Sequence, residues 1–558
     1  MQLTGAEILL ECLKEQDVDT IFGYPGGAVL NIYDALARYP NNIRHYLTSH
    51  EQGAAHAADG YARVTGKVGV CMATSGPGAT NLVTGIATAY MDSVPVVAIT
   101  GNVALPLLGK DSFQEVDISG ITMPITKHNF IVKDIDNLST IIRRAFHIAQ
   151  DGRCGPVLID IPKDITAATT EYEPRQPLPL NCHTESITDE AIDKAVQIIK
   201  SSKRPLIYAG GGVVQSNAAS ELIEFAEKIN APVTTSLMGL GGFSGTHKLF
   251  CGLVGMHGTK TSNLAATKCD VLIALGARFS DRVVSNVEKF APKAKIIHID
   301  IDPAEINKNV DTYHHIIGDV KAVLQKLNGF IEKRINNTEE WTEQINHWKA
   351  AYPLNYKNDG KLRPQYIMER IYALTDGEAI ISTEVGQNQI WAAQFYRYTQ
   401  PRSFISSGGL GTMGYGLGAA IGAQIGQPQK RVFNIAGDGS FRMNCNELAT
   451  AVEYNLPIIV VVFNNRALGM VRQWQDLFYD SRFSQTTIDR ATDFVKLAEA
   501  YGALGFNLTR NEDVDQILET ALKSNRTVVI DCEIDQDDKV FPIVPPGAAI
   551  DQLITEEV

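Results

Sequence analysis

The chain has 558 residues, of which 44% are hydrophobic and 20% charged, with a formal net charge of −13. This composition indicates a soluble globular protein of roughly three or four domains, and the acidic balance argues against nucleic acid or an anionic membrane as main partner. No apolar run reaches the roughly 18 residues of a membrane span. The N-terminal sequence lacks signal-peptide features, and the eight cysteines form no C-x-x-C motif. We therefore expect reduced thiols in a cytoplasmic protein.

Residues 1–170 alternate predicted helices and strands. Thr4 and Glu7 form a capping box that opens an amphipathic helix. The apolar runs 68–72 and 94–100 end in the turn sequences SGPG and TGN. Such alternation is typical of an α/β domain with a parallel sheet. The proline-containing stretch 171–186 lacks periodicity and predicts a linker.

Two further α/β domains are expected. The first covers 187–332, with strands at 271–275 and 295–299 and a helix over 218–228. A polar stretch containing a helix then leads to a domain over 364–540, and residues 541–558 form an arm draped over the body. The predicted fold class is α/β, with three doubly wound parallel-sheet domains.

The segment 431–465 carries the clearest local signal. Its apolar runs 432–436 and 458–463 predict buried parallel strands, with a helix over 444–455 between them. Asp438 and Asn465 directly follow these strands, where open α/β sheets bind ligands. Carboxylate and amide oxygens suit Mg²⁺, and glycines beside Asp438 admit a diphosphate. A plain Gly-Asp-Gly turn is the alternative explanation of this sequence alone.

Glu51 stands between a predicted strand and a helix of small residues. A carboxylate at that place can simply stabilise the helix N-terminus.

Longer motifs decide between these interpretations. The sequence GDG, followed by 24 residues and NN, resembles the thiamine diphosphate signature of the decarboxylase–carboligase superfamily. Further stretches in all three predicted domains resemble the catalytic large subunits of the acetohydroxyacid synthase (acetolactate synthase) family. These stretches are FGYPGGAV, SHEQGAAHAADGYAR, TSGPGATN, FQEVD, GPVLIDIPKD, GMHGT, ARFSDRV, SGGLGTMGYG, GDGSF and NNRALGMVRQWQ.

The resemblance implies a thiamine diphosphate site. Glu51 would hydrogen-bond the aminopyrimidine ring and promote loss of the thiazolium C2 proton, and Met413 would hold the cofactor bent, although an isolated Met is more often a core residue. Asn388 stands where the family usually has His. Metal binding is implied for Asp438, Asn465 and Ala467. Other implied contacts are Tyr24, Pro25, Gly26, Thr74, Pro77, Asn81, Val385, Gly386, Gln387, Gly411, Gly437, Gly439, Ser440, Leu468, Gly469 and Met470.

Substrate residues are implied in the same way. Arg282 would bind the acceptor carboxylate and Trp474 would shape the pocket for its alkyl group. Without the resemblance, Arg282 would be explained by a surface ion pair with Asp281, and Trp474 by packing in the core. The other implied residues are Gly27, Phe113 and Gln114 at the first-substrate site and Lys163 near its entrance.

The middle domain raises the question of a dinucleotide. Glycines 210–212 do not complete G-x-G-x-x-G, because Gln215 occupies the third glycine position, which disfavours a nicotinamide dehydrogenase. The resemblance instead implies a non-redox FAD, with Ser280 and Gly242 departing from the common family residues. Its implied contacts are Arg153, Gly211, Gly212, Thr235, Leu237, Met238, Met256, His257, Gly276, Arg278, Asp300, Ile301 and Asp319.

The family resemblance implies the first common step of branched-chain amino acid synthesis. Pyruvate would be decarboxylated and its two-carbon unit joined to pyruvate or 2-ketobutyrate. The family also implies a homodimer or homotetramer with active sites at the dimer interface, and a small regulatory subunit. Alternatives are a catabolic acetolactate synthase, a pyruvate oxidase-like enzyme, or a catalytically silent homologue.

Overall fold

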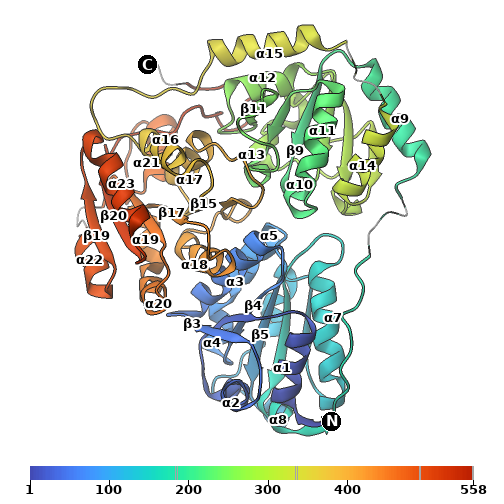
Figure 1. The fold of residues 1–558 in the computed structure, drawn as a ribbon, viewed down its shortest axis with the longest axis vertical. Coiled ribbons are helices and arrows are strands. Elements are labelled where there is room, and N and C mark those ends of the chain that lie inside the picture. The colour runs from blue at the N-terminus through green and yellow to red at the C-terminus, as the bar shows by residue number, and fades with distance from the viewer. Residues whose placement is uncertain (182–183, 185, 333–334, 336, 489–491, 556–558) are drawn as a thin grey trace.

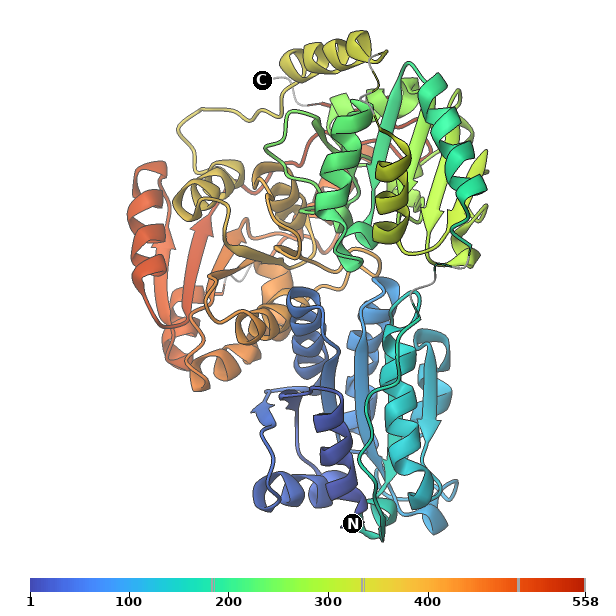
Figure 2. The ribbon, with the colours of Figure 1, turned by 45° about the vertical axis from the view of Figure 1, so that its right-hand side comes forward.

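The protein consists of three six-stranded parallel sheets with helices packed on them (Figures 1 and 2). The computed structural model describes residues 1–181, 184, 186–332, 335, 337–488 and 492–555. The predicted fold class is therefore confirmed. No described helix has the length and apolar character to cross a membrane, and the described cysteines form no disulfide, whereas Cys182 lies outside the described residues.

The first sheet has the strand order β3-β2-β4-β5-β7-β6. A capping box opens α1 as predicted: Thr4 Oγ1 accepts from Glu7 N at 3.3 Å, and Thr4 N donates to Glu7 Oε2 at 2.8 Å. A short antiparallel pair, β1 (Gln2–Thr4) and β8 (Thr169–Glu171), brings the ends of this unit together. The six strands are Thr20–Gly23 (β2), Arg44–Leu47 (β3), Gly69–Ala73 (β4), Val96–Asn102 (β5), His128–Ile131 (β6) and Val157–Pro162 (β7). The helices are Gly5–Glu15 (α1), Leu30–Arg38 (α2), Glu51–Thr65 (α3), Pro77–Asn81 (α4), Val83–Met91 (α5), Ile118–Thr122 (α6), Leu138–Gln150 (α7) and Lys163–Ala167 (α8).

The middle sheet has the order β11-β10-β9-β12-β13-β14. The strands predicted over 271–275 and 295–299 are present as β12 and β13, because their β-branched runs are buried in the sheet. The strands are Pro205–Ala209 (β9), Val233–Thr235 (β10), Phe250–Leu253 (β11), Val271–Leu275 (β12), Lys295–Asp300 (β13) and His314–Ile317 (β14). The helices are Asp189–Ser201 (α9), Gly211–Gln215 (α10), Ala219–Ile229 (α11), Lys260–Lys268 (α12), Asp281–Val284 (α13) and Val320–Phe330 (α14).

The third sheet has the order β16-β15-β17-β18-β20-β19. Its strands are Ile380–Thr383 (β15), Phe404–Ile405 (β16), Val432–Gly437 (β17), Ile459–Asn464 (β18), Leu504–Leu508 (β19) and Val528–Glu533 (β20). Its helices are Pro364–Thr375 (α16), Gln387–Phe395 (α17), Gly416–Gly426 (α18), Asp438–Asn444 (α19), Leu448–Glu453 (α20), Gly469–Phe478 (α21), Phe494–Tyr501 (α22) and Val514–Lys523 (α23).

The helix predicted over 444–455 is wrong in its bounds. Helix α19 begins directly at Asp438, and a 3₁₀ turn at Cys445–Glu447 separates it from α20. This 3₁₀ turn ends at Glu447, whose side chain accepts hydrogen bonds from backbone N–H groups of the first domain.

Two segments outside the sheets cross between domains. Helix α15 (Glu339–Ala351) lies over the middle domain (Figure 1), where Trp341 Nε1 donates to the carbonyl of Pro205. After residue 540 the chain returns to the middle domain. There Asn263 Nδ2 donates to Ile550 O at 2.7 Å, and Ile550 is buried.

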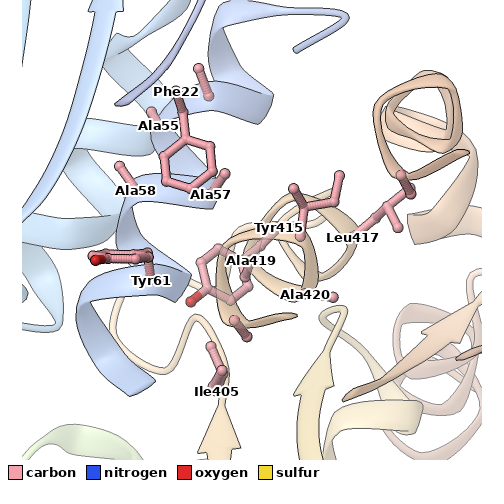
Figure 3. Packing of buried hydrophobic residues seen from close by; sticks show 14 of the residues in the cluster. Phe22, Ala55, Ala57, Ala58, Tyr61, Ile405, Tyr415, Leu417, Ala419 and Ala420 are labelled. Carbon is pink, nitrogen blue, oxygen red and sulfur yellow. The ribbon is translucent and has the colours of Figure 1, made fainter. Parts of the chain in front are cut away.

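The first and third domains share one hydrophobic core, in which α3 packs against α18 (Figure 3). The two helices approach closely because glycine lies at the contact on both sides. A Cβ atom added to Gly60 would lie 2.1 Å from Ala419 O, and one added to Gly422 would lie 1.8 Å from Ala57 O. Neither position can carry a side chain at this helix separation.

A buried charged cluster completes this contact. Arg63, in the last turn of α3, binds Asp59 at 2.6 Å and Asp92 at 2.9 Å. Tyr415, which precedes α18, donates to Asp59 Oδ1 at 2.5 Å. Asp92 also accepts from the backbone N–H groups of Gly408 and Gly409. Because every charge in the cluster is paired, its burial is compensated and it fixes the two domains in one orientation.

We expect Gly422→Ala to lower the thermal unfolding midpoint, because the added methyl group forces α18 away from Ala57. The cost should be about 1–3 kcal/mol, as for other overpacked contacts. Gly329→Ala in α14 is the matched control, since a Cβ there meets nothing within 4 Å. An unchanged midpoint for Gly422→Ala would show that α3 and α18 do not meet as described.

Candidate active site

A small cavity of about 60 Å³ lies at the carboxyl ends of β17 and β18. Parallel strands that end at one edge bring their following residues together, as the sequence predicted for Asp438 and Asn465. The α17 and α21 N-termini also reach this edge. The residues from the predicted cofactor set that line this cavity are Val385, Gly386, Gln387, Asn388, Met413, Gly437, Asp438, Gly439, Ser440, Asn465, Ala467, Leu468, Gly469 and Met470.

Asp438 is the only carboxylate that lines this small cavity among the described residues. Its side chain is 3% exposed, and its Oδ1 has no hydrogen-bond partner in the described part of the chain. Burial raises the pKa of Asp438 to about 7. A buried carboxylate oxygen without a partner is the environment that a bound cation would stabilise.

Asn465 is held by hydrogen bonds that orient its amide. Its Nδ2 donates to Gln387 Oε1 at 3.2 Å, and its Oδ1 accepts from Ala467 N at 3.1 Å. Gln387 is itself fixed, because its Nε2 donates to Gln473 Oε1 and to Asp538 O. These contacts set the position of an amide oxygen beside Asp438, as outer partners do around metal ligands.

Two glycines of this cavity pack so closely against neighbouring side chains that neither position can carry a side chain of its own. A Cβ on Gly469 would lie 2.0 Å from Gln387 Oε1, and one on Gly439 would lie 2.5 Å from Leu468 Cδ2. Asn388 is buried and donates one amide N–H to Ile435 O at 2.8 Å. Since an amide carries two N–H groups, this bond leaves one of them available.

A much larger cavity, of about 1480 Å³, is lined by residues of all three domains. It lies at the carboxyl ends of the middle-sheet strands and extends to residues 385–386 and 407–411. Every residue of the predicted FAD set except Thr235 lines it: Arg153, Gly211, Gly212, Leu237, Met238, Met256, His257, Gly276, Arg278, Asp300, Ile301 and Asp319. Thr235 ends β10 and is fully buried.

The two predicted specificity residues line the same large cavity. Arg282 belongs to the short helix α13. Its Nη1 lies 3.5 Å from Met256 Sδ, and its Nε lies 3.8 Å from Asp281 Oδ2. Trp474 stands on α21 and packs edge-to-face on Phe478 at 5.3 Å between ring centroids. Trp474 is partly exposed and so lies outside the fully buried core.

The residues predicted in the first domain form a separate group. Asn81 Nδ2 donates to Glu51 Oε2 at 2.9 Å, and Thr74 Oγ1 accepts from Ala28 N at 3.2 Å. A Cβ on Gly26 would lie 2.5 Å from Thr74 Cβ. The 24–27 loop, the start of α3 and the 74–81 turn thus meet at one end of the first sheet.

Glu51 is the first residue of α3 and is 9% exposed. It lines neither cavity, and neither do Tyr24, Pro25, Gly26, Gly27, Thr74, Pro77, Asn81, Phe113, Gln114 and Lys163. Phe113 is 88% exposed, an unusual state for a large aromatic side chain. The described chain therefore presents the two halves of the predicted cofactor site in different places.

Comparison with known proteins matches all three domains. Three domain models of the thiamine pyrophosphate enzyme family match this chain. The N-terminal binding domain matches residues 3–121, the central domain 192–327 and the C-terminal binding domain 384–532. The acetolactate synthase large subunit of Buchnera aphidicola is 46% identical over 99% of this chain and 98% of its own length. The chain belongs to the acetolactate synthase large-subunit family.

Relatives of similar closeness come from distant organisms. A probable acetolactate synthase large subunit of Methanocaldococcus jannaschii is 48% identical over 99% of this chain and 95% of its own length. The large subunit of Haemophilus influenzae is 43% identical over 99% and 98%. The resemblance drawn from the motifs is confirmed over nearly the whole chain.

Membership of this family assigns thiamine diphosphate to the first and third domains, and the cavity at Asp438 fits its diphosphate end. The unpartnered Asp438 oxygen and the oriented Asn465 amide could hold a cation, and the glycines beside them could let phosphate oxygens approach the backbone. In the described residues no three His, Cys, Asp or Glu side chains gather into a metal cluster. A site with one carboxylate suits a cation that shares its coordination with a phosphate.

Glu384 is a residue near this cavity that the sequence analysis did not identify. Its Oε2 accepts from Ser440 Oγ and from Gly414 N, each at 2.7 Å, and its Oε1 accepts from Leu417 N at 3.3 Å. Burial raises the pKa of Glu384 to about 7. It thereby joins the Met413 turn to Ser440, and it uses the hydroxyl hydrogen of Ser440. The available sequence signal is its place directly after β15, immediately before Val385 and Gly386.

We expect Mg²⁺ binding, in the presence of thiamine diphosphate, to weaken as the pH falls from 8 to 6. The Asp438 pKa of about 7 means that the carboxyl holds a proton below that pH, and the cation must displace it. One displaced proton corresponds to about a tenfold loss of affinity per pH unit below the pKa. Calorimetric titration at several pH values measures the slope.

Asp438→Asn is the control. The asparagine amide binds no proton in this pH range, so only the diphosphate of the cofactor still titrates. The slope should be steeper in the wild type than in the variant. Equal slopes would contradict the assignment of Asp438 as the residue that exchanges a proton for the cation.

Proposed function

We propose that the protein is the catalytic subunit of an acetolactate synthase that contains thiamine diphosphate, Mg²⁺ and FAD. It converts two pyruvate molecules to 2-acetolactate and CO₂, or pyruvate and 2-ketobutyrate to 2-aceto-2-hydroxybutyrate and CO₂. This is the first common step of branched-chain amino acid synthesis. The single observation that carries the proposal is the near-full-length similarity to acetolactate synthase large subunits.

The chemistry is divided between the cofactor and the chain. Thiamine diphosphate supplies the electron sink for decarboxylation and the carbon nucleophile for joining the two substrates. Asp438, Asn465 and the Ala467 carbonyl would hold Mg²⁺, and with it the diphosphate end of the cofactor. Met413, beside Gly439 and Ser440 at the cavity wall, orients the cofactor. Holding the reacting groups in one geometry is itself a major part of the rate enhancement.

Glu51 moves a proton at a ring nitrogen of the aminopyrimidine. A carboxyl of low exposure is suited to this exchange, and Asn81 Nδ2 fixes its direction at 2.9 Å. The loop 22–29, FGYPGGAV, carries no acid or histidine. The loop therefore offers no carboxylic acid or imidazolium as a proton donor, which favours joining to a second keto acid over protonation.

The acceptor keto acid binds between the middle and third domains. Arg282 pairs with its carboxylate, since a planar guanidinium provides two parallel donors. Trp474 bounds the alkyl group, where one methylene contributes about 1–3 kcal/mol and favours 2-ketobutyrate. The exposure of the Arg282 side chain, whose nearest acid is 3.8 Å away, supports its availability for substrate. Phe113, Gln114 and Gly27 line the first-substrate site, and Lys163 lies near its entrance.

The 1480 Å³ cavity would hold FAD, which would have no redox role. Gly212 approaches Gly276 so closely that a Cβ there would lie 2.6 Å from its Cα, which leaves only backbone at this edge. Arg153, bound to Asp302 at 3.1 Å and to Glu305 at 2.7 Å, places a cation in the lining. A dinucleotide with a pyrophosphate suits a cavity with these features.

The active enzyme is a homodimer or a homotetramer in the cytoplasm. Glu51 of one copy and Asp438 of another then meet on one cofactor, which accounts for their separate places in a single chain. Exposed apolar side chains in the first domain, including Phe113, Met123 and Leu47, support a surface of this domain that another copy covers. The name "large subunit" of the relatives supports a small regulatory partner.

The test is incubation with pyruvate, Mg²⁺, thiamine diphosphate and FAD, with acetolactate, CO₂ and dissolved oxygen recorded together. We expect one acetolactate for each CO₂ and constant oxygen. Oxygen uptake would identify a pyruvate oxidase instead, and the absence of any product would identify a catalytically silent homologue.

Glu51→Gln should lower acetolactate formation by about 10²–10⁴-fold, the usual contribution of a positioned acid–base group. The amide keeps the volume of the side chain and its bond to Asn81, so the thermal midpoint and FAD content should not change. Glu11→Gln, on α1 in the same domain, is the control. Full turnover by the Glu51 variant would contradict the role given to this carboxyl.

A further inference from the structure

Glu447 is a buried carboxylate that the proposed reaction does not use. It ends the 3₁₀ turn that follows α19 and is 1% exposed. Its Oε2 accepts from Ser49 N at 3.1 Å and its Oε1 accepts from His50 N at 3.0 Å. One side chain of the third domain thus accepts hydrogen bonds from two successive backbone N–H groups of the first domain.

These two N–H groups belong to the residues immediately before Glu51. His50 is the N-cap of α3, and its Nδ1 accepts from Gln52 N at 3.1 Å. The carboxylate also lies against the first turn of this helix, because a Cβ on Gly53 would lie 2.1 Å from Glu447 Oε1. Glu447 therefore contacts the backbone on both sides of Glu51.

Neighbouring contacts reinforce this attachment. Ser49 Oγ donates to Asn446 O at 2.9 Å, and Leu47 N donates to Tyr454 OH at 2.8 Å. Thr450 Oγ1 donates to Glu447 Oε2 at 2.6 Å and so fixes the carboxylate itself. The path from β3 to α3 is held at several points by the segment 446–454.

Burying the carboxylate of Glu447 between the two domains costs free energy. Burial raises the pKa of Glu447, and among the described residues no Lys, Arg or His forms an ion pair with it. Only the two N–H groups and the Thr450 hydroxyl compensate its burial. An apolar side chain would join the domains at lower cost, so the specific benefit lies in the position that the carboxylate gives to the backbone.

We propose that Glu447 is a positioning residue that sets the place of Glu51, and thereby the rate at which Glu51 exchanges its proton with the cofactor. The proposal rests on the proposed function, because it needs Glu51 to act on bound thiamine diphosphate. A displacement of the helix start by about 1 Å is enough to slow such a step by about 10²-fold. Glu447 acts through Glu51 and does not itself touch cofactor or substrate.

The experiment is a double-mutant cycle on the full-length enzyme. The rate of deuterium exchange at C2 of bound thiamine diphosphate is measured by acid quench and proton NMR for the wild type, Glu51→Gln, Glu447→Gln and the double variant. We expect Glu447→Gln to slow exchange by about 10–10²-fold in the wild-type background and by less than about twofold in the Glu51→Gln background. Thiamine diphosphate affinity should stay unchanged.

Two further variants make the result specific. Glu453→Gln, an exposed glutamate on α20, is the matched control and should leave exchange at the wild-type rate. Thr450→Val removes only the hydroxyl that fixes the carboxylate, and it should slow exchange several-fold, again only when Glu51 is present. If Glu447→Gln does not fold, the Thr450→Val cycle decides the question.

An equal slowing of exchange in both backgrounds would overturn the proposal, because Glu447 would then act on the fold in general. An unchanged rate in Glu447→Gln and Thr450→Val would overturn it as well. Failure of the proposed function has a different signature, since the wild type itself would then neither exchange the C2 proton nor form acetolactate.

Discussion

The contact between α3 and α18 determines how the first and third domains are placed. Two glycines, Gly60 and Gly422, bring the helix backbones so close that no side chain fits between them. The shared hydrophobic core around this contact and the buried Asp59–Arg63–Asp92 cluster allow one orientation only. Since α3 begins with Glu51, and α18 follows the turn that carries Met413, the same contact holds the two helices whose N-terminal ends carry these proposed site residues.

Several polar side chains carry this constraint outward from the helix pair. Asp92 accepts from the backbone of Gly408 and Gly409, which line the large cavity. Glu384 ties the turn before α18 to Ser440 in the small cavity. Two buried carboxylates, Asp92 and Glu384, thus accept from backbone N–H groups and set the positions of the loops at the two cavities. The rigid placement suits an enzyme that relies on the geometry of a bound cofactor.

The sequence predicted the three parallel sheets because buried strands alternate visibly with amphipathic helices. It also predicted the meeting of Asp438 and Asn465, since the ends of neighbouring parallel strands share one edge. The roles of Arg282, Trp474 and the FAD set came from family resemblance alone and stay predictions. Glu447 was missed because its partners lie 397 and 398 residues away in the chain, and no local pattern records such a pair. The small residues of α3 also gave no sign of the domain contact, in which Ala57 and Ala58 pack in the shared core (Figure 3).

The central claim is that one active site takes its acid–base residue from one copy of the chain and its metal ligands from another. Mixing the two inactive variants Glu51→Gln and Asp438→Asn, under conditions where subunits exchange, tests it most directly. Each mixed dimer then has one site with both substitutions and one intact site, so random exchange should restore about a quarter of the wild-type acetolactate rate. If mixed dimers form, as shown by differently tagged copies, and activity stays at the level of the separate variants, the site is not shared between chains.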